Sequence, residues 1–465
     1  MKINRAYKTK LSLTRQQINY FKQCGRVART VFNWCLRDYM SDYEQYYQVF
    51  SPFLKHLRDR GAIPEGRLSD EDWDTVFREA KAQGIDLPKR PRSGGRGARK
   101  KKLNGIKKAD PKLAKITNYP YVILQSAVDD FDAAVQRYEE KRKTGAVDRK
   151  IAEMNSTTLK AARYRKRIAK LLAKGRIGNE LDPFFPSFKS RHDDCRFRFE
   201  GNTVKLSPDG NSIKLPKIPW LIRFAETGYI PANPKRICRV AISQDRDDWY
   251  ISVTVEEEIT PPETKPVTLG VSIGVIDTAA TSAGIYYENP RFYDKFAKKK
   301  AQLQAELTRR GQRDENGNLT NRTSNWKKTK AKLSRLERKI ANSRKHHLHN
   351  VSKAITETLP STIVVKDMDV QAMMQADKPA SRHLNRRMAD AGMGELRRQI
   401  EYKAGWNGAT VEASKEAVAE ICSVCGKPSA TINYTTKMMT CPCGHTQRAS
   451  VNMAINLSRK EINHA

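Results

Sequence analysis

Residues 267–276 are the stretch that most constrains how this chain can fold. The run Val-Thr-Leu-Gly-Val-Ser-Ile-Gly-Val-Ile is mostly apolar, is rich in β-branched residues and carries one serine, Ser272, between Gly270 and Gly274. A short apolar run of this composition predicts a buried β-strand. We therefore expect this strand at the centre of a sheet, with the Ser272 hydroxyl inside it.

The rest of the chain predicts several domains, because 465 residues are too many for one hydrophobic core. Before the central strand we expect a strand over 2–10, a helix from Leu13 to about residue 40 capped by Thr14 and Gln17, a helix over 121–142, another over 157–174, and mostly β-structure over 190–260 with a hairpin of 237–242 and 249–255. After it we expect a strand over 279–287, basic helices over 292–308 and 326–356, a buried strand over 362–365, a helix over 385–404, a strand over 410–413 and a last helix over 452–462.

The composition favours a polyanionic partner. The chain has 87 lysines and arginines against 51 acids, a formal charge of +36, and such an excess raises affinity for phosphate backbones. A membrane surface is the weaker candidate, since no basic amphipathic helix with aromatic anchors stands out and no apolar run reaches the ~18 residues of a membrane span. The first residues lack the apolar core of a signal peptide, so we expect a cytoplasmic, nucleoid-associated protein.

Basic residues are concentrated in a few segments. Ten of the twenty residues over 89–108 are basic and none is acidic, and their Gly, Pro and Ser predict a flexible basic loop, with a solvated linker as the alternative. Over 327–345, nine residues are basic and one is acidic, which suits a helix along a nucleic acid. The residues expected to contact phosphates are Arg99, Lys100, Lys101, Lys102, Arg163, Arg165, Arg167, Lys189, Arg191, Lys332, Arg335 and Lys339.

Four of the eight cysteines form a metal-ligand pattern. Cys422 and Cys425 lie two residues apart before a glycine, and Cys441 and Cys443 lie one residue apart before another glycine. Two thiolate pairs on tight glycine turns are typical of a zinc ribbon, and four thiolates satisfy tetrahedral Zn²⁺ in a closed structural site. The second pair is one residue shorter than usual, so His445 in place of one sulfur and a ribbon that no longer binds metal are alternatives.

The order of these elements resembles the TnpB family of transposon-encoded RNA-guided nucleases, to which the type V CRISPR effectors are similar. The segments that carry the resemblance are Phe32-Asn-Trp34, Pro186-Ser-Phe-Lys189, Cys422-Ser-Val-Cys425-Gly and Asn452-Met-Ala-Ile-Asn456. It implies a multidomain α+β fold. Its parts are a helical recognition domain over 11–188, a β-barrel-like wedge domain over 1–10 and 189–265, and a ribonuclease-H-like (RuvC) α/β domain over 266–420 and 447–465, with a zinc ribbon inserted over 421–446.

The resemblance also implies three catalytic acids, and this chain lacks them at the matching positions. The motif G-[IV]-D-x-G matches Gly270-Val-Ser272-Ile-Gly274, and [IV]-V-x-E-[DN]-[LM] matches Ile363-Val-Val-Lys366-Asp-Met. The motif D-R-D-x-N-A-A-x-N matches Arg448-Ala-Ser450-Val-Asn452-Met-Ala-Ile-Asn456. Ser272, Lys366 and Ser450 therefore replace the acids, and arginine replaces the first aspartate of the third motif.

The loss of these carboxylates predicts the loss of catalysis. Two-metal phosphodiester hydrolysis needs acids that hold both cations, whereas a serine hydroxyl is a poor Mg²⁺ ligand and a lysine ammonium repels the metal. We therefore expect structural Zn²⁺ but no catalytic Mg²⁺. Asp277, Asp367 and Asp369 are the acids that could substitute, although Asp367 should point to the opposite strand face from Lys366.

The binding machinery implied by the resemblance is retained. We expect a nuclease-inactive protein that binds a guide RNA and double-stranded DNA beside a short recognition motif, and that blocks the site and represses transcription. Three alternatives remain open: a nuclease-inactive type V CRISPR-like effector that silences mobile DNA, a nuclease that uses displaced acids, and an RNA-binding protein without a DNA target.

Overall fold

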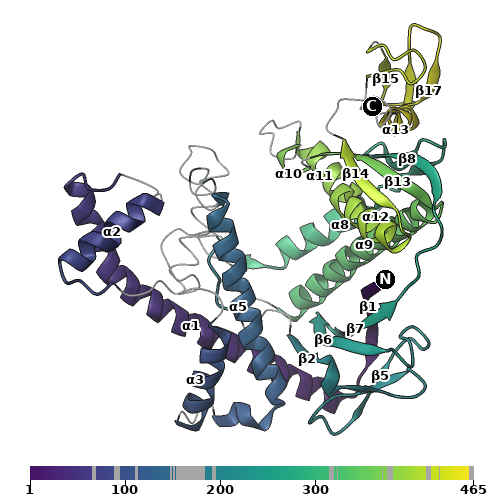
Figure 1. Ribbon diagram of the computed structural model, residues 1–465. Helices are drawn as coiled ribbons and strands as arrows, with labels where there is room; N and C mark the ends of the chain where they lie inside the picture. Colours follow the sequence, from purple (N-terminus) through teal and green to yellow (C-terminus); the bar gives the residue numbers. More distant parts are fainter. Residues whose placement is uncertain are drawn as a thin grey trace. The chain divides into compact units, whose positions relative to one another are not determined.

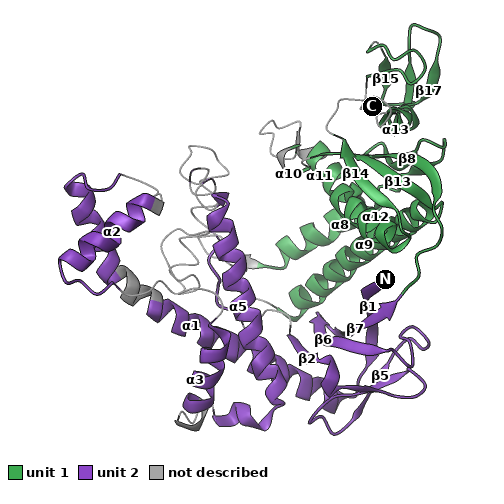
Figure 2. Cartoon of the chain, viewed as in Figure 1, with its two compact units in different colours: residues 1, 259–465 green, residues 2–258 purple. Residues whose placement is uncertain are grey.

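Two compact units make up this computed structural model. The N-terminal unit is Lys2–Glu258, and the C-terminal unit is Ile259–Ala465 together with Met1 (purple and green in Figure 2). No helix in the described part of the chain is long and apolar enough to cross a membrane. The structure describes residues 1–64, 70–87, 95–109, 114–146, 149, 152, 184–190, 195–313, 319–321, 323–368, 370–373, 381–414, 420–428 and 430–459.

The N-terminal unit combines long helices with an antiparallel sheet of order β2-β6-β7-β1-β5-β4-β3. Its elements are β1 (Lys2–Ser12), α1 (Arg15–Asp59), α2 (Asp70–Ala82), α3 (Arg96–Ala109), η1 (Lys115–Asn118), α5 (Tyr121–Lys143), β2 (Arg196–Glu200), η2 (Gly201–Thr203), β3 (Lys205–Leu206), β4 (Ser212–Lys214), β5 (Leu221–Phe224), β6 (Arg236–Asp245) and β7 (Asp248–Glu258).

Local sequence signals explain several of these elements. The predicted cap of α1 is confirmed, because the Gln17 amide donates to the Thr14 hydroxyl and the Thr14 amide donates to the Gln17 side chain. The predicted hairpin is also confirmed: β6 and β7 pair from Asp245↔Asp248 outward, and β7 alternates buried and half-buried side chains. The helix α1 runs well beyond the predicted end, to Asp59.

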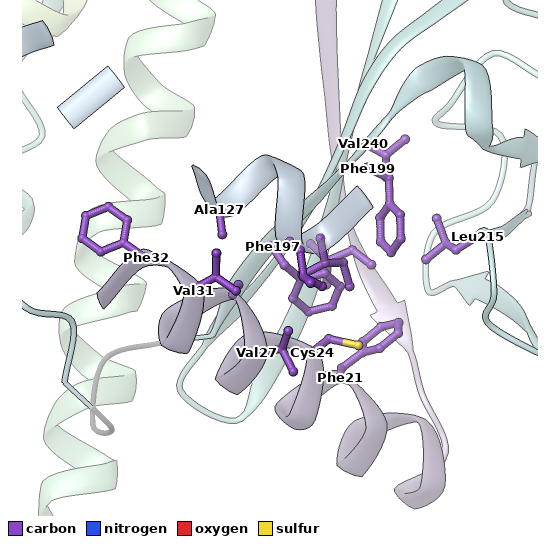
Figure 3. Close-up of a cluster of buried hydrophobic side chains, with 14 of the residues drawn as sticks. Phe21, Cys24, Val27, Val31, Phe32, Ala127, Phe197, Phe199, Leu215 and Val240 are labelled. Carbon is purple, nitrogen blue, oxygen red and sulfur yellow. The ribbon is translucent and has the colours of Figure 1, made fainter. Parts of the chain in front are cut away.

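The core of the N-terminal unit lies where α1 and α5 pack on the sheet (Figure 3). Phe21, Cys24, Val27 and Val31 recur at helical spacing along α1 and are buried. The Phe21 ring meets the Phe197 ring of β2 edge-on, with centroids 5.5 Å apart. Burial of apolar surface, at about 25 cal/mol per Å², thus fixes these helices against the strands.

The C-terminal unit contains a five-stranded sheet, several helices and a small three-stranded sheet. Its elements are β8 (Lys265–Ile273), β9 (Asp277–Thr281), β10 (Tyr286–Glu288), α8 (Phe292–Arg309), β11 (Gln312–Arg313), β12 (Leu319–Asn321), α9 (Ser324–Thr356), β13 (Pro360–Lys366), α10 (Val370–Met373), α11 (Ser381–Ala391), α12 (Met393–Trp406), β14 (Thr410–Ser414), β15 (Thr431–Asn433), β16 (Met438–Thr440), β17 (Thr446–Arg448) and α13 (Ala449–Ser458).

The predicted central strand is confirmed. The sheet order is β10-β9-β8-β13-β14, so β8 is its middle strand; β9 and β10 are antiparallel neighbours, and β13 and β14 run parallel to β8. Leu269, Val271 and Ile273 face a core shared with α9 and α12, while α13 covers the other face (Figure 1). This is an α+β arrangement of the RuvC-like kind that the sequence predicted.

Four predictions about elements are wrong in detail. Residues 96–109 form the helix α3 rather than a flexible loop. Residues 279–287 belong to two strands, β9 and β10, which a turn after Thr281 separates. Residues 385–404 belong to two helices, because the chain turns at Gly392. The last helix begins at Ala449. The predicted helix over 157–174 lies outside the described residues.

Candidate functional site

The three positions that match the family's acids lie on one face of the five-stranded sheet. Val365 of β13 pairs with Val271 of β8, so the next residues, Lys366 and Ser272, lie at the same level of two adjacent parallel strands. Ser450 lies in the first turn of α13. Ser272 and Ser450 are buried, whereas Lys366 is half-buried.

Close packing of α13 on β8 sets this geometry. At Gly270 an added Cβ would lie 1.9 Å from the carbonyl oxygen of Ala454, so only glycine allows this approach. Val364 of β13 packs on Leu457 from the same helix. Since side chains alternate along a strand, Ser272 and Lys366, two residues beyond Gly270 and Val364, face α13 as well. Ser450 lies one turn before Ala454, at the end of β8 where Ser272 lies.

The buried carboxylate of Asp277 is the centre of the site, and it is fully engaged by the protein itself. Arg448 donates two hydrogen bonds to it, Nε to Oδ2 at 2.8 Å and Nη2 to Oδ1 at 2.7 Å. The Ser450 hydroxyl donates to Oδ2 at 2.6 Å, and the Lys437 ammonium lies 3.5 Å from Oδ1. The Asp277 side chain is 0% exposed, so protein donors surround its oxygens.

These contacts determine the protonation of Asp277. Burial by itself raises the pKa of this carboxyl, but the hydrogen bonds from Arg448 and Ser450 and the charges of Arg448 and Lys437 outweigh burial and lower the pKa below its ordinary value. Asp277 is therefore a carboxylate at neutral pH. Its negative charge is balanced by two cations.

The cluster continues onto β10. Glu288 lies 3.5 Å from Arg448 and 3.6 Å from Lys437, and the Arg448 guanidinium stacks 3.7 Å from the centroid of the Tyr286 ring. Lys437 comes from the turn between β15 and β16, so the cluster joins the small three-stranded sheet to the strands β9 and β10. We call Asp277, Glu288, Lys437, Arg448 and Ser450 the ion cluster.

Asp367, another acid named as a substitute, does not reach this face. Asp367 accepts a hydrogen bond from Arg397 of α12 at 2.9 Å, which confirms that it points away from Lys366, toward the α9 and α12 face. Asp369 lies outside the described residues. Within the ranges that the structure describes, the Lys366 ammonium has no hydrogen-bond or ion-pair partner.

The four cysteines converge as a metal site would require. Their sulfur atoms all lie within 4.8 Å of one another, with Cys422 to Cys443 at 3.8 Å and Cys425 to Cys441 at 3.6 Å. A tetrahedron with metal–sulfur bonds of about 2.3 Å has edges of about 3.8 Å, so four thiolates at these distances fit one tetrahedral ion. We call residues 420–448 the cysteine ribbon.

Matching glycine turns build the two halves of this site. Gly426 has φ +70° and donates to the Cys422 carbonyl; Gly444 has φ +87° and donates to the Cys441 carbonyl. Backbone amides near the sulfurs lower the pKa of Cys422 and lower that of Cys441 to about 6, which favours thiolates at these two positions. At Cys443 the His445 backbone amide lowers the pKa, but the neighbouring sulfurs outweigh it and raise the pKa to about 12. The His445 ring lies 3.2 Å from the Gln447 side-chain oxygen, and His445 does not belong to the sulfur cluster.

The residues predicted to contact phosphates differ in their contacts within the protein. Arg99 is buried and pairs with Asp132 at 3.6 Å, Lys100 pairs with Asp129 at 2.9 Å, and Lys102 pairs with Asp38. These three cations therefore contact acids of α1 and α5, whereas Lys101 is exposed.

Lys189 also has an internal contact. Its ammonium lies 3.8 Å from the centroid of the Phe32 ring. Arg163, Arg165, Arg167 and Arg191 lie outside the described residues.

On α9, the predicted residues do form a stripe. Lys332, Arg335 and Lys339 are exposed, as is Lys328 one turn before them, which was not among the predicted contacts. The four recur at spacings of four, three and four residues, so they lie on one face of the helix. Leu333, Leu336 and Ile340 on another face are buried. A row of cations along an exposed helix face can follow a phosphate backbone.

Sequence reasoning missed the pairing of Asp277 with Arg448. The two residues are 171 positions apart, and neither is unusual alone. One signal was present: arginine and serine replace two aspartates of one motif while an aspartate follows the central strand. A new cation in that motif, together with an acid after the central strand, is the pattern from which the Arg448–Asp277 ion pair could have been suspected.

Three family models match parts of the chain. "Probable transposase" (OrfB_IS605) matches residues 250–377, "Cas12f1-like, TNB domain" matches 394–457, and "Helix-turn-helix domain" matches 1–48. In this structure residues 1–48 form β1 and the first part of a single helix, α1.

Named relatives extend the match. "Putative RNA-guided DNA endonuclease InsQ" of Escherichia coli is 32% identical over 59% of this chain and 67% of its own length. A "Putative RNA-guided DNA endonuclease" of Streptomyces pristinaespiralis is 26% identical over 47% and 51%, and MT2953 of Mycobacterium tuberculosis, which has the same description, is 27% identical over 59% and 61%. The chain thus matches between about half and two thirds of the length of these relatives.

Two solved structures also match over most of their length, at low identity and low TM-score. "Cryo-EM structure of the Cas12f1-sgRNA-target DNA complex" matches at 14% identity with a TM-score of 0.31, over 99% of this chain and 100% of that one. "Structure of the mini-RNA-guided endonuclease CRISPR-Cas_phi3" matches at 10% identity with a TM-score of 0.38, over 98% and 92%. Family membership rests on the sequence relatives: the chain belongs to the OrfB/TnpB family of transposon-encoded proteins.

Proposed function

We propose that this chain is a nuclease-inactive, RNA-guided DNA-binding protein that blocks a matched DNA site and so represses transcription. One observation carries the proposal. On the face where the family places its metal-binding acids stand Ser272, Lys366 and Ser450, and the adjacent carboxylate of Asp277 is bound by Arg448, Ser450 and Lys437.

Metal chemistry supports the loss of cleavage. A two-metal site needs carboxylate oxygens whose lone pairs are free to bind cations about 4 Å apart. The Asp277 oxygens already accept hydrogen bonds from an arginine and a serine, and two cations lie within 3.5 Å. A Mg²⁺ ion would have to displace Arg448 and Lys437 and approach the ammonium of Lys366, which has no ion-pair partner among the described residues. Each step opposes binding.

The partners follow from the family and from charge. The relatives are named RNA-guided DNA endonucleases, so a guide RNA and a DNA duplex are the nucleic acids that a member without cleavage would retain. The formal charge of +36 and the exposed stripe on α9 suit a phosphate backbone. In this scheme the N-terminal unit supplies the recognition and wedge parts, and Lys366 meets a phosphate.

We further infer that the ion of the cysteine ribbon is zinc. Four thiolates in a closed tetrahedral set are the donor set of structural Zn²⁺ sites, and such a site supplies folding energy rather than chemistry. The ribbon carries Lys437 and Arg448, so its folding would hold the ion cluster in place.

Three measurements on the full chain test the function. The RNA that copurifies from the native host is sequenced, and its variable end defines a matched duplex. Guide-dependent binding to that duplex is then measured by gel shift, and cutting is measured in Mg²⁺. We expect a single defined RNA, a stable complex and no cleavage.

Other results would overturn the proposal or select an alternative. Mg²⁺-dependent cutting that disappears in Asp277→Ala or Asp367→Ala would show an active nuclease with displaced acids. A defined RNA without guide-dependent duplex binding would make the chain an RNA-binding protein alone. A guide derived from a CRISPR repeat, rather than from a transposon end, would assign it to silencing of mobile DNA.

A further inference from the structure

Helix α8 presents an aromatic and basic surface that the proposed function leaves without a role. None of its side chains is buried, although its first two turns carry Phe292, Tyr293 and Phe296. Two of these rings have one cation nearby: Lys295 lies 5.8 Å from the Phe292 centroid, and Lys339 of α9 lies 5.4 Å from the Phe296 centroid. Half-exposed rings beside cations are the usual platform for unpaired bases.

Of these three aromatic residues, Tyr293 has two cations close to its ring. Arg386 of α11 lies 5.0 Å from its ring centroid and Lys300 lies 5.1 Å from it, so two helices direct cations at one ring. The Tyr293 backbone amide donates to the Asp390 carboxylate at 2.9 Å. This bond ties the start of α8 to α11 and fixes the ring against the helix that supplies Arg386.

A groove opens at this ring between α8, α9 and α11. Its volume is about 320 Å³, which lies at the lower end of the range for small-ligand sites and suits one nucleotide. Tyr293 and Ile340 give it an apolar wall. Lys300, Glu337, Arg344 and Arg386 supply polar groups at its rim.

Two cations of the groove are paired with acids of the protein, and a third is free to contact a ligand. Arg344 donates to the Ala389 carbonyl at 2.8 Å and pairs with Asp390, and Lys300 pairs with Glu337 at 3.4 Å. Arg386, by contrast, is exposed and has no ion pair within the described ranges; its recorded contact is the Tyr293 ring. A guanidinium stacked on a ring keeps its N–H donors free for a phosphate.

We propose that this groove binds one unpaired nucleotide of a single-stranded nucleic acid. The base lies against Tyr293 and Ile340, and the phosphate meets Arg386. A duplex does not fit, because its bases are stacked and paired and would have to leave the helix first. The source of the strand rests on the proposed function: displaced DNA and an unpaired part of the guide RNA offer the same chemistry.

Binding of short oligonucleotides to the full chain, freed of RNA, tests the site without any guide. Fluorescence anisotropy is measured with single-stranded DNA and RNA of one sequence, about 15 nucleotides long, and with the corresponding duplex. We expect Tyr293→Ala and Arg386→Ala to weaken single-strand binding about 5-fold or more, as loss of one stacked base requires. Tyr293→Phe keeps the ring and retains affinity, and duplex binding changes less than about 2-fold in all three.

A matched control separates the groove from general charge. Lys298 is an exposed cation of the same helix, outside the groove, so Lys298→Ala removes one charge and no platform. If Tyr293→Ala weakens single strands no more than Lys298→Ala, or weakens duplex equally, the proposal is wrong. Preference for the DNA or the RNA strand identifies the source.

A base analogue gives a second, direct readout. The fluorescence of 2-aminopurine in the oligonucleotide falls when the base stacks on a ring, so we expect quenching by the native chain and by Tyr293→Phe, and none by Tyr293→Ala. Quenching that persists in Tyr293→Ala would place the base elsewhere. Neither experiment uses a guide or a matched target, so failure of the groove and failure of guided binding are separate results.

Discussion

At the scale of single residues, Asp277 is the side chain on which the ion cluster depends. Removing its carboxylate would leave Arg448 and Lys437 without their buried counter-charge. Breaking a buried pair from one side costs about 3 kcal/mol or more. We predict that Asp277→Ala lowers the free energy of unfolding by about this amount, as measured by urea denaturation.

A matched substitution gives the comparison. Asp367 also accepts a 2.9 Å hydrogen bond from an arginine, but its side chain is 43% exposed. An exposed pair contributes less than about 1 kcal/mol. Equal losses for Asp367→Ala and Asp277→Ala would contradict the view that burial makes the ion cluster important.

The lowered pKa of Asp277 adds a pH dependence with a definite sign. A carboxyl whose folded pKa is depressed stabilises the fold above its unfolded pKa, about 3.9, and this contribution is lost as pH falls through the folded pKa. We predict that the stability difference between the native chain and Asp277→Asn is full above about pH 5 and shrinks below about pH 4. A difference that stays constant to pH 3 would show that the charge of Asp277 contributes nothing.

His445 and Cys441 test the ligand set of the cysteine ribbon. The His445 ring contacts Gln447, while Cys441 belongs to the sulfur cluster. We predict that His445→Ala retains one zinc per chain by elemental analysis and native mass spectrometry, and that Cys441→Ser falls well below one. Loss of zinc in His445→Ala would make the histidine a ligand and one sulfur a bystander.

At the scale of elements, the contact of α13 with β8 decides whether the nuclease-like face forms. A Cβ at position 270 would meet a backbone carbonyl at 1.9 Å, and a backbone carbonyl cannot turn away as a flexible side chain can. We predict that Gly270→Ala costs about 3 kcal/mol in the free energy of unfolding, at the upper end for overpacking.

Gly394 of α12 provides the control, because an added Cβ there meets nothing within 4 Å. Alanine favours helix over glycine by about 1 kcal/mol, so Gly394→Ala should leave stability unchanged or raise it. If both substitutions have the same small effect, α13 does not pack on β8 as described.

Elements also show where sequence reasoning succeeds. The strand β8 was predictable because a short, continuous apolar run is typical of a strand buried in the middle of a sheet. The cap of α1 was predictable because its two residues lie only three positions apart. The helix α3 was not predictable from its glycines and lysines. It is held by Leu103, which is buried in the core, and by ion pairs with Asp38, Asp129 and Asp132 on other helices, none of which can be assigned from a local window.

At the scale of the whole molecule, the site also has parts that could be predicted from local sequence and parts that could not. The positions of Ser272, Lys366 and Ser450 could be read from motifs, and the alternation of side chains along a strand places Ser272 and Lys366 on one face. The engagement of Asp277 by Arg448 could not, because it depends on how β17 and α13 meet β9. The four cysteines could be predicted in part. Their spacing predicts a shared ion, but the approach of the sulfurs to within 4.8 Å of one another depends on the folded structure.

The large positive charge of the molecule is partly gathered in the cationic stripe of α9. Lys332 is exposed on the cationic stripe and has no partner in the described part of the chain, so its ammonium is available to a phosphate. Each phosphate contact releases a counterion, and loss of one contact reduces the slope of log affinity against log salt by about 1. We predict this change for Lys332→Ala on random duplex DNA.

Lys353 of the same helix is the control, because it pairs with Glu357 at 3.5 Å and its removal also frees an acid. Its loss changes the total charge of the chain by the same amount as the loss of Lys332. If the field of the whole molecule determined affinity, both variants would shift binding alike. A reduced slope in Lys332→Ala alone shows that the stripe itself contacts the backbone, because counterion release counts local contacts rather than net charge.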